Sequence, residues 1–184
     1  MKKVSGILIV LLFAGLFANA QKYITKNGHI KFYSDTPIET IEAHNRQVNS
    51  ALDVQSGDFV FKVLMRGFEF EKALMQEHFN ENYVESHKYP DATFVGKISN
   101  LDEIDLAKDG KYDAEVVGNL TIHGVTNEIQ ETGTLEVKDG VIHGDAVFTV
   151  LVDDYDIKIP KAVTENIAEE IEITVDVELE KLES

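Results

Sequence analysis

The chain has no cysteine and no tryptophan among its 184 residues, and only three prolines. Without cysteine it cannot form disulfides, use thiolate chemistry or carry the cysteine-linked lipid of a bacterial lipoprotein. The folded protein must therefore be stabilised by packing and hydrogen bonds. The lack of tryptophan and cysteine also argues against an immunoglobulin-type sandwich, whose core usually contains both.

Basic residues are scarce too, because 17 Lys and Arg stand against 33 Asp and Glu, giving a formal net charge of −16. A field of this sign repels phosphate backbones and anionic lipid surfaces. We therefore expect no nucleic-acid partner and no electrostatic docking to membranes. An anionic ligand would need a local basic pocket.

Long apolar runs are missing apart from one near the start of the chain. Lys2 and Lys3 precede an apolar stretch over residues 7–17, and Ala18-Asn19-Ala20 supplies the small residues that signal peptidase reads. This stretch is shorter than the about 20 residues of a membrane span. We predict a signal peptide over residues 1–20 with cleavage after Ala20, a periplasmic or secreted location, and no stable membrane insertion. Cleavage would remove two lysines and take the formal charge from −16 to −18.

The remaining residues, 21–184, are about the size of one ordinary domain, and alternation of apolar and polar residues dominates them. It is clearest over residues 171–180, where every second residue is Ile, Val or Leu, as in a strand with one dry face. Similar runs occupy residues 29–34, 58–65, 93–98, 115–122, 129–137 and 141–152. Turn signals at residues 56–58, 108–110 and 138–140 include Asp-Gly pairs, which favour tight hairpins. The strands should therefore be mainly antiparallel.

One interval departs from this alternation. From Glu71 to Tyr83 the apolar residues recur at spacings of three and four, which predicts a short amphipathic helix ending well before Tyr89-Pro90. A second short helix or loop is expected over residues 163–168. Many antiparallel strands with one helical insertion indicate an all-β fold. A closed barrel of about eight strands would remove exposed edges and leave room for one small ligand.

The usual marks of catalysis are absent, since the sequence has no Gly-x-Ser-x-Gly elbow, phosphate loop, dinucleotide fingerprint or His-Glu-x-x-His helix. The densest group of potential metal ligands is Glu77, His78, Glu81 and His87, which do not converge on one helix face. We expect no metal, no cofactor and no enzyme activity. An enzyme would need at least two of Glu77, His78, His87 and Asp154 around one cavity.

Two segments resemble the signature of the YceI-like family of exported proteins. Residues 79–94 end in Tyr-Pro-Asp-Ala-Thr-Phe, and residues 118–126 read Gly-Asn-Leu-Thr-Ile-His-Gly-Val-Thr. The run over residues 74–88 is closest to Bacteroidota members. The resemblance spans nearly the whole mature chain. It implies an extended, lipocalin-like barrel whose apolar interior carries or sequesters a polyisoprenoid or similar long-chain lipid, without bond chemistry.

Phenylalanine, methionine and tyrosine are concentrated in residues 59–83, and such adaptable side chains suit either an ordinary core or a tunnel for a flexible apolar ligand. Composition alone favours the core, whereas the resemblance favours the tunnel. Met75, Phe79 and Tyr83 would then form a helical lid over one end. The candidate lining residues are Phe59, Phe61, Met65, Phe68, Phe70, Met75, Phe79, Tyr83 and Phe148.

The ligand's headgroup is harder to predict. Many family members have a histidine followed by a cation where this chain has Glu77 and Phe79, which weakens the case for a pyrophosphate. A cation that points into the mouth could compensate, and the options are Arg66, Lys62, Lys72 and Lys88. Arg66 is the candidate headgroup contact, because an arginine can hold phosphate with two parallel hydrogen bonds. The alternative function is a stress-related extracytoplasmic interaction module with a filled barrel and no cavity. The oligomeric state is left open, with a dimer as one option.

Overall fold

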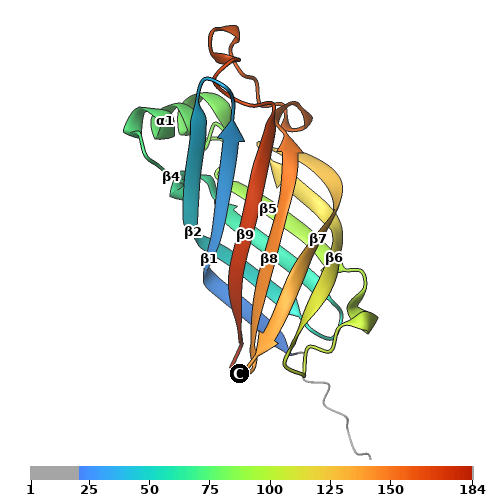
Figure 1. Ribbon diagram of the computed structural model, residues 1–184. Helices are drawn as coiled ribbons and strands as arrows, with labels where there is room; N and C mark the ends of the chain where they lie inside the picture. Colours follow the sequence, from blue (N-terminus) through green and yellow to red (C-terminus); the bar gives the residue numbers. More distant parts are fainter. Residues whose placement is uncertain (1–20, 184) are drawn as a thin grey trace, which may run out of the picture.

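The computed structural model describes residues 21–183, whose strands close into an antiparallel barrel (Figure 1). Around the barrel the strands follow the order β1-β9-β8-β7-β6-β5-β3-β2, and pairing of β1 with β2 closes the ring. The two-residue strand β4 (Glu69–Phe70) is added beside β2. The predicted all-β, lipocalin-like barrel of about eight strands is confirmed. The eight strands are β1 (Lys22–Asp35), β2 (Thr40–Asp53), β3 (Asp58–Leu64), β5 (Asp91–Ile98), β6 (Gly110–Ile122), β7 (Val125–Lys138), β8 (Val141–Leu151) and β9 (Glu170–Lys181).

Strand β2 is the one wall strand that the sequence pattern did not predict. In the first half of the strand the odd-numbered residues Ala43 and Asn45 face inward. From Val48 onward the even-numbered residues face inward instead. The register with β1 shifts at this point, because Ile30 pairs with Asn45 but Gly28 pairs with Val48. This bulge interrupts the two-residue period by which a strand is recognised. Asn45 is fully buried there, where its amide donates to the Leu64 carbonyl oxygen at 2.8 Å.

The turn predictions have mixed outcomes. Asp139 and Gly140 join β7 to β8 with φ values of 52° and 82°, the left-handed backbone of a tight hairpin. Residues 56–58 lie at the β2–β3 turn as predicted. The prediction of a hairpin at residues 108–110 was wrong: Gly110 begins β6 after an irregular connection that contains a 3₁₀ turn, Leu101–Glu103.

The helical insertion lies where the spacing predicted it. Helix α1 (Ala73–His78) continues into a π-helical turn, Phe79–Tyr83, and both end before Tyr89. In the second interval a 3₁₀ turn, Lys161–Val163, precedes an irregular segment. Both insertions lie at the end of the barrel away from the C-terminus, which we call the upper end (Figure 1).

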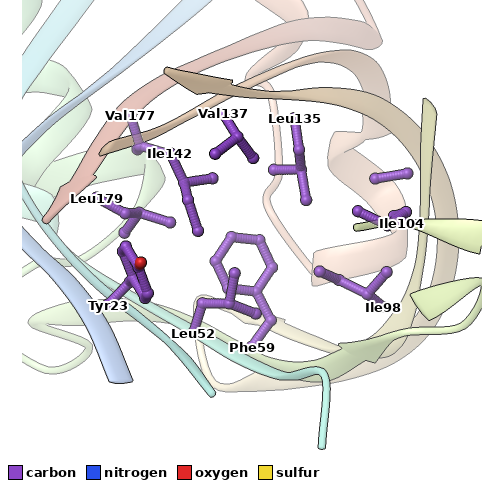
Figure 2. Close-up of a cluster of buried hydrophobic side chains, with 11 residues drawn as sticks. Tyr23, Leu52, Phe59, Ile98, Ile104, Leu135, Val137, Ile142, Val177 and Leu179 are labelled. Atoms are coloured by element: carbon purple, nitrogen blue, oxygen red, sulfur yellow. The ribbon is translucent and has the colours of Figure 1, made fainter. Parts of the chain in front are cut away.

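The lower end is filled by a hydrophobic core. Figure 2 shows its side chains pointing toward one another across the barrel interior. Leu52, Ile142 and Leu179 are completely buried there, and Val177 almost so. The core therefore closes the barrel from below, and an internal space can open only toward the upper end.

The barrel wall is not uniformly paired. Strands β7 and β8 form a ladder from Lys138–Val141 to Gly133–Ala146, and the ladder ends there. Above that point β7 remains paired with β6, and β8 remains paired with β9. We call the unpaired boundary between residues 125–132 and 147–151 the β7–β8 seam. The 3₁₀ turn Val152–Tyr155 caps it, where the Asn127 amide donates to the Asp154 carbonyl oxygen at 2.7 Å.

Candidate functional site

An apolar cavity of about 460 Å³ occupies the barrel between the lower core and the helical insertion. Its volume lies within the range of about 300–1,000 Å³ typical of small-molecule sites. Inward-facing residues of the upper barrel, such as Leu120, Ile129 and Ile173, line it and keep part of their surface accessible. The barrel is therefore hollow above its lower core.

All nine residues predicted to line a tunnel lie on the wall of this cavity. Strand β3 contributes two of them, and the segment after β3 contributes Met65 and Phe68. Helix α1 and its π-helical extension place Met75, Phe79 and Tyr83 over the space, while Phe148 faces it from β8. The set is Phe59, Phe61, Met65, Phe68, Phe70, Met75, Phe79, Tyr83 and Phe148. Whether they contact a ligand stays a prediction.

The helical insertion is held onto the barrel by a cluster of phenylalanines. The Phe79 ring centroid lies 5.4 Å from that of Phe32, 5.6 Å from Phe68 and 5.1 Å from Phe70. The rings of Phe32 and Phe79 are stacked. The Phe68 ring lies edge-on and the Phe70 ring tilted to Phe79, and such arrangements are favourable for aromatic rings at these distances. Phe79 therefore anchors α1 to strands β1 and β4 while also facing the cavity.

Sequence reasoning missed the small residues that create the space. Ala114, Gly133, Gly144 and Ala146 face the cavity from three adjacent strands, β6, β7 and β8. The absence of large side chains at these inward positions leaves volume that a filled barrel would occupy. The sequence shows small residues at these inward-facing positions of the strands. That they lie beside one another becomes clear only when the neighbouring strands are aligned.

A second pair of glycines allows an aromatic ring to lie against the wall. Gly96 and Gly118 pair directly across β5 and β6. The outer edge of the Phe94 ring lies where a β-carbon of either residue would stand, 2.6 Å and 2.9 Å away. Backbone atoms lie closer still, because the Val117 carbonyl oxygen borders the β-carbon position at Gly96 and the Gly96 Cα borders the one at Gly118. Only glycine therefore fits at these two positions without a shift of the paired strands or of Phe94.

Charged side chains are sparse along the cavity wall, and among the described lining residues none is Lys or Arg. Glu39 lies at the upper rim, where one carboxylate oxygen accepts from Lys72 at 3.0 Å and the other from Asn166 at 3.4 Å. These contacts join the β1–β2 turn, the start of α1 and the segment before β9. Glu131 lies deeper, on β7, and burial raises the pKa of its carboxyl group.

Arg66, the candidate headgroup contact, does not line the apolar cavity. Its Nε donates to Ser86 Oγ at 3.3 Å, and its side chain borders a separate polar pocket with Gln76, Asn80 and His87. The Oδ1 atom of Asn80 is buried and has no hydrogen-bond partner within residues 21–183. A headgroup contact by Arg66 would therefore have to occur outside the main cavity.

The residues required for the enzyme alternative are not brought together. His78 lines the apolar cavity, His87 borders the polar pocket, and neither Glu77 nor Asp154 lines either space. Among residues 21–183, no three His, Asp or Glu side chains are placed to hold a metal ion. The same residues contain no helix long and apolar enough to cross a membrane.

The two signature segments meet at the upper end. His123 has its Nδ1 3.0 Å from the Tyr155 carbonyl oxygen and its Nε2 3.0 Å from a Glu85 carboxylate oxygen. The Tyr89 ring packs edge-on against His123 with centroids 4.7 Å apart. The hydrogen bond to His123 holds the pKa of Glu85 below its ordinary value. The signature thus joins the helical insertion, the β6–β7 turn and the segment after β8.

Residues 22–179 match the model of the YceI-like domain. The chain belongs to the YceI-like family. Comparison with curated protein sequences gives no significant match.

Solved structures with the same fold include other YceI-like barrels. A polyisoprenoid-binding domain from Saccharophagus degradans, implicated in plant cell wall breakdown, has a TM-score of 0.75 at 12% identity, covering 89% of this chain and 99% of that domain. Burkholderia cenocepacia BcnA has a TM-score of 0.68 at 16% identity, covering 83% and 95%. The Campylobacter jejuni YceI protein has a TM-score of 0.53 at 16% identity, covering 100% and 92%. At these identities the likeness shows the shared fold.

Proposed function

We propose that this YceI-like protein is an exported, non-catalytic carrier that binds one long-chain apolar lipid of the isoprenoid class inside its barrel. The observation that carries the proposal is the apolar cavity of about 460 Å³, lined by phenylalanine, methionine and branched aliphatic side chains. Burying a lipid chain there removes apolar area from water, at about 25 cal/mol per Å² before ordering costs.

The polyisoprenoid-binding neighbour from Saccharophagus degradans supports the isoprenoid class, because it has the same barrel over 99% of its length. Export rests on the predicted signal peptide, which lies outside the described residues. A periplasmic or secreted protein of this acidity would carry its ligand through water without binding to anionic lipid surfaces.

Native mass spectrometry of the mature protein, purified gently from its own envelope fraction, tests this proposal. We expect the protein mass to be that of a chain beginning at Gln21. We also expect one additional bound mass, which denaturing lipid analysis identifies as an isoprenoid. A clean mass that stays clean after incubation with isoprenoid and fatty-acid pools would contradict carriage. The alternative of an interaction module without a small ligand would then be preferred, although the cavity argues against its filled-barrel form.

A further inference from the structure

One ionisable side chain faces the cavity from the middle of the barrel wall. Glu131 lies on the inward face of β7 between Ile129 and Gly133, and all three residues line the cavity. Its partner across the β6–β7 ladder is the apolar Val116. On its other side the ladder with β8 has already ended at Gly133. Glu131 is thus placed where the wall is apolar or unpaired.

No protein group within residues 21–183 satisfies this carboxyl. Glu131 has neither a hydrogen bond nor an ion pair there, and burial alone accounts for its altered acidity. Of the other two acidic residues along the cavity, Glu39 is held at the rim by Lys72 and Asn166, and Asp145 is exposed on the outward face of β8. The Glu131 oxygen atoms keep some accessible surface, because among the described residues only Asn80 Oδ1 is a fully buried side-chain oxygen or nitrogen without a partner. A bound chain would cover these atoms, and a carboxyl group covered without a hydrogen-bond partner is destabilising, so a ligand that fills the cavity must itself supply that partner.

The surroundings define the chemistry of that group. Burial favours the neutral carboxylic acid, which can both donate and accept a hydrogen bond. The lining contains no Lys or Arg to balance a negative charge. Burial raises the pKa of Tyr155, which also lines the cavity, and the negative charges of Asp154 and Glu131 raise it further. An anionic headgroup at this depth would be both desolvated and repelled.

We propose that Glu131 is the polar contact for the bound lipid and that the cavity selects a long chain carrying a neutral oxygen group over one carrying a phosphate or carboxylate. The oxygen group is a hydroxyl or a carbonyl. This inference rests on the proposed lipid-binding function and adds the residue and the headgroup class. A hydroxyl can donate to this carboxyl group in either protonation state, and a carbonyl can accept from it when the acid is neutral.

Displacement of a neutral lipophilic dye by three C20 probes tests the inference: geranylgeraniol, geranylgeranyl pyrophosphate and the hydrocarbon phytane. The wild type is compared with Glu131→Leu, Glu131→Gln and the matched control Glu128→Leu, which changes an exposed, outward-facing glutamate of the same strand. We expect the wild type to bind the alcohol about five- to tenfold more tightly than the other two probes.

Glu131→Leu should lose that preference by weakening the alcohol and not the hydrocarbon, whereas Glu131→Gln should retain most of it, because an amide also donates and accepts. Glu128→Leu should behave like the wild type. An unchanged ratio of alcohol to hydrocarbon in Glu131→Leu would overturn the inference, as would pyrophosphate binding equal to that of the alcohol, while leaving lipid carriage intact. If no C20 probe binds the wild type, the proposed function and this inference fail together.

Discussion

Neighbouring residues of strand β3 face opposite sides of the barrel wall. Phe61 lines the cavity, whereas the preceding Val60 points outward and is 38% exposed. We predict that Phe61→Asp abolishes lipid binding, because it places a carboxylate against the bound chain, and that it lowers the free energy of unfolding by about 1–3 kcal/mol. Val60→Asp, the matched control, should bind normally. Lipid titration of both variants, with circular dichroism to verify the fold, makes the comparison; equal binding would remove Phe61 from the site.

Glu131 also predicts how stability depends on pH in the ligand-free protein. Burial raises its pKa in the folded state above the ordinary value of 4.5. Its favourable contribution is therefore fully present below pH 4.5 and is lost as pH rises through the raised pKa, because the unfolded chain ionises first. Glu131→Gln should remove this loss. The stability of the variant relative to the wild type should therefore be higher at pH 7 than at pH 4. Thermal melts at both values give the answer, and an equal difference at both pH values would contradict it.

At the scale of elements, the hairpin turns offer a clean comparison. Gly124 in the β6–β7 turn and Gly140 in the β7–β8 turn have φ values of 78° and 82°. A β-carbon at Gly124 would meet the Tyr89 ring at 2.5 Å, whereas one at Gly140 meets nothing within 4 Å. Both alanine variants share the left-handed backbone cost, of order 1–3 kcal/mol. We predict that Gly124→Ala costs about 1–2 kcal/mol more.

Chemical denaturation of the two variants measures this difference. The double variant Gly124→Ala/Tyr89→Ala supplies a second reading, because removing the ring should make the added methyl group less costly. Equal losses in the two single variants would mean that the contact between the signature segments contributes little.

The elements also show what the sequence could and could not predict. Seven wall strands followed from alternation, and the helix followed from its spacing. Strand β2 did not, because the bulge at Asn45 and Gln47 shifts its inward face and breaks the alternation. Only the register with β1 shows that the strand continues beyond the bulge. Among site residues, the phenylalanines were recognisable by type. Glu131 and Gly133 were not, since their significance depends on strands β6 and β8 being beside them.

At the scale of the whole molecule, the acidic imbalance should make stability rise with salt. The chain has 33 acidic and 17 basic side chains, so like charges repel across its surface. Opposing this are exposed pairs such as Lys62–Asp91 at 2.8 Å, which contribute little individually. We predict that raising sodium chloride from about 20 to 300 mM increases the melting temperature by about 2–4 °C per kcal/mol of repulsion screened. A falling melting temperature would mean that specific ion pairs outweigh the net charge.

The β7–β8 seam is a stretch of the described barrel wall that no ladder of backbone hydrogen bonds holds together. Below Gly133 and Ala146 each strand from β6 to β9 is paired with the next, so widening this part of the wall would break backbone hydrogen bonds. Above this pair the ladder does not continue within the described residues, and the Asn127–Asp154 hydrogen bond at 2.7 Å ties the two sides together again at the upper end. We therefore expect a wider ligand to disturb the wall first along this stretch, whereas the depth of the cavity is set by the packed core beneath it.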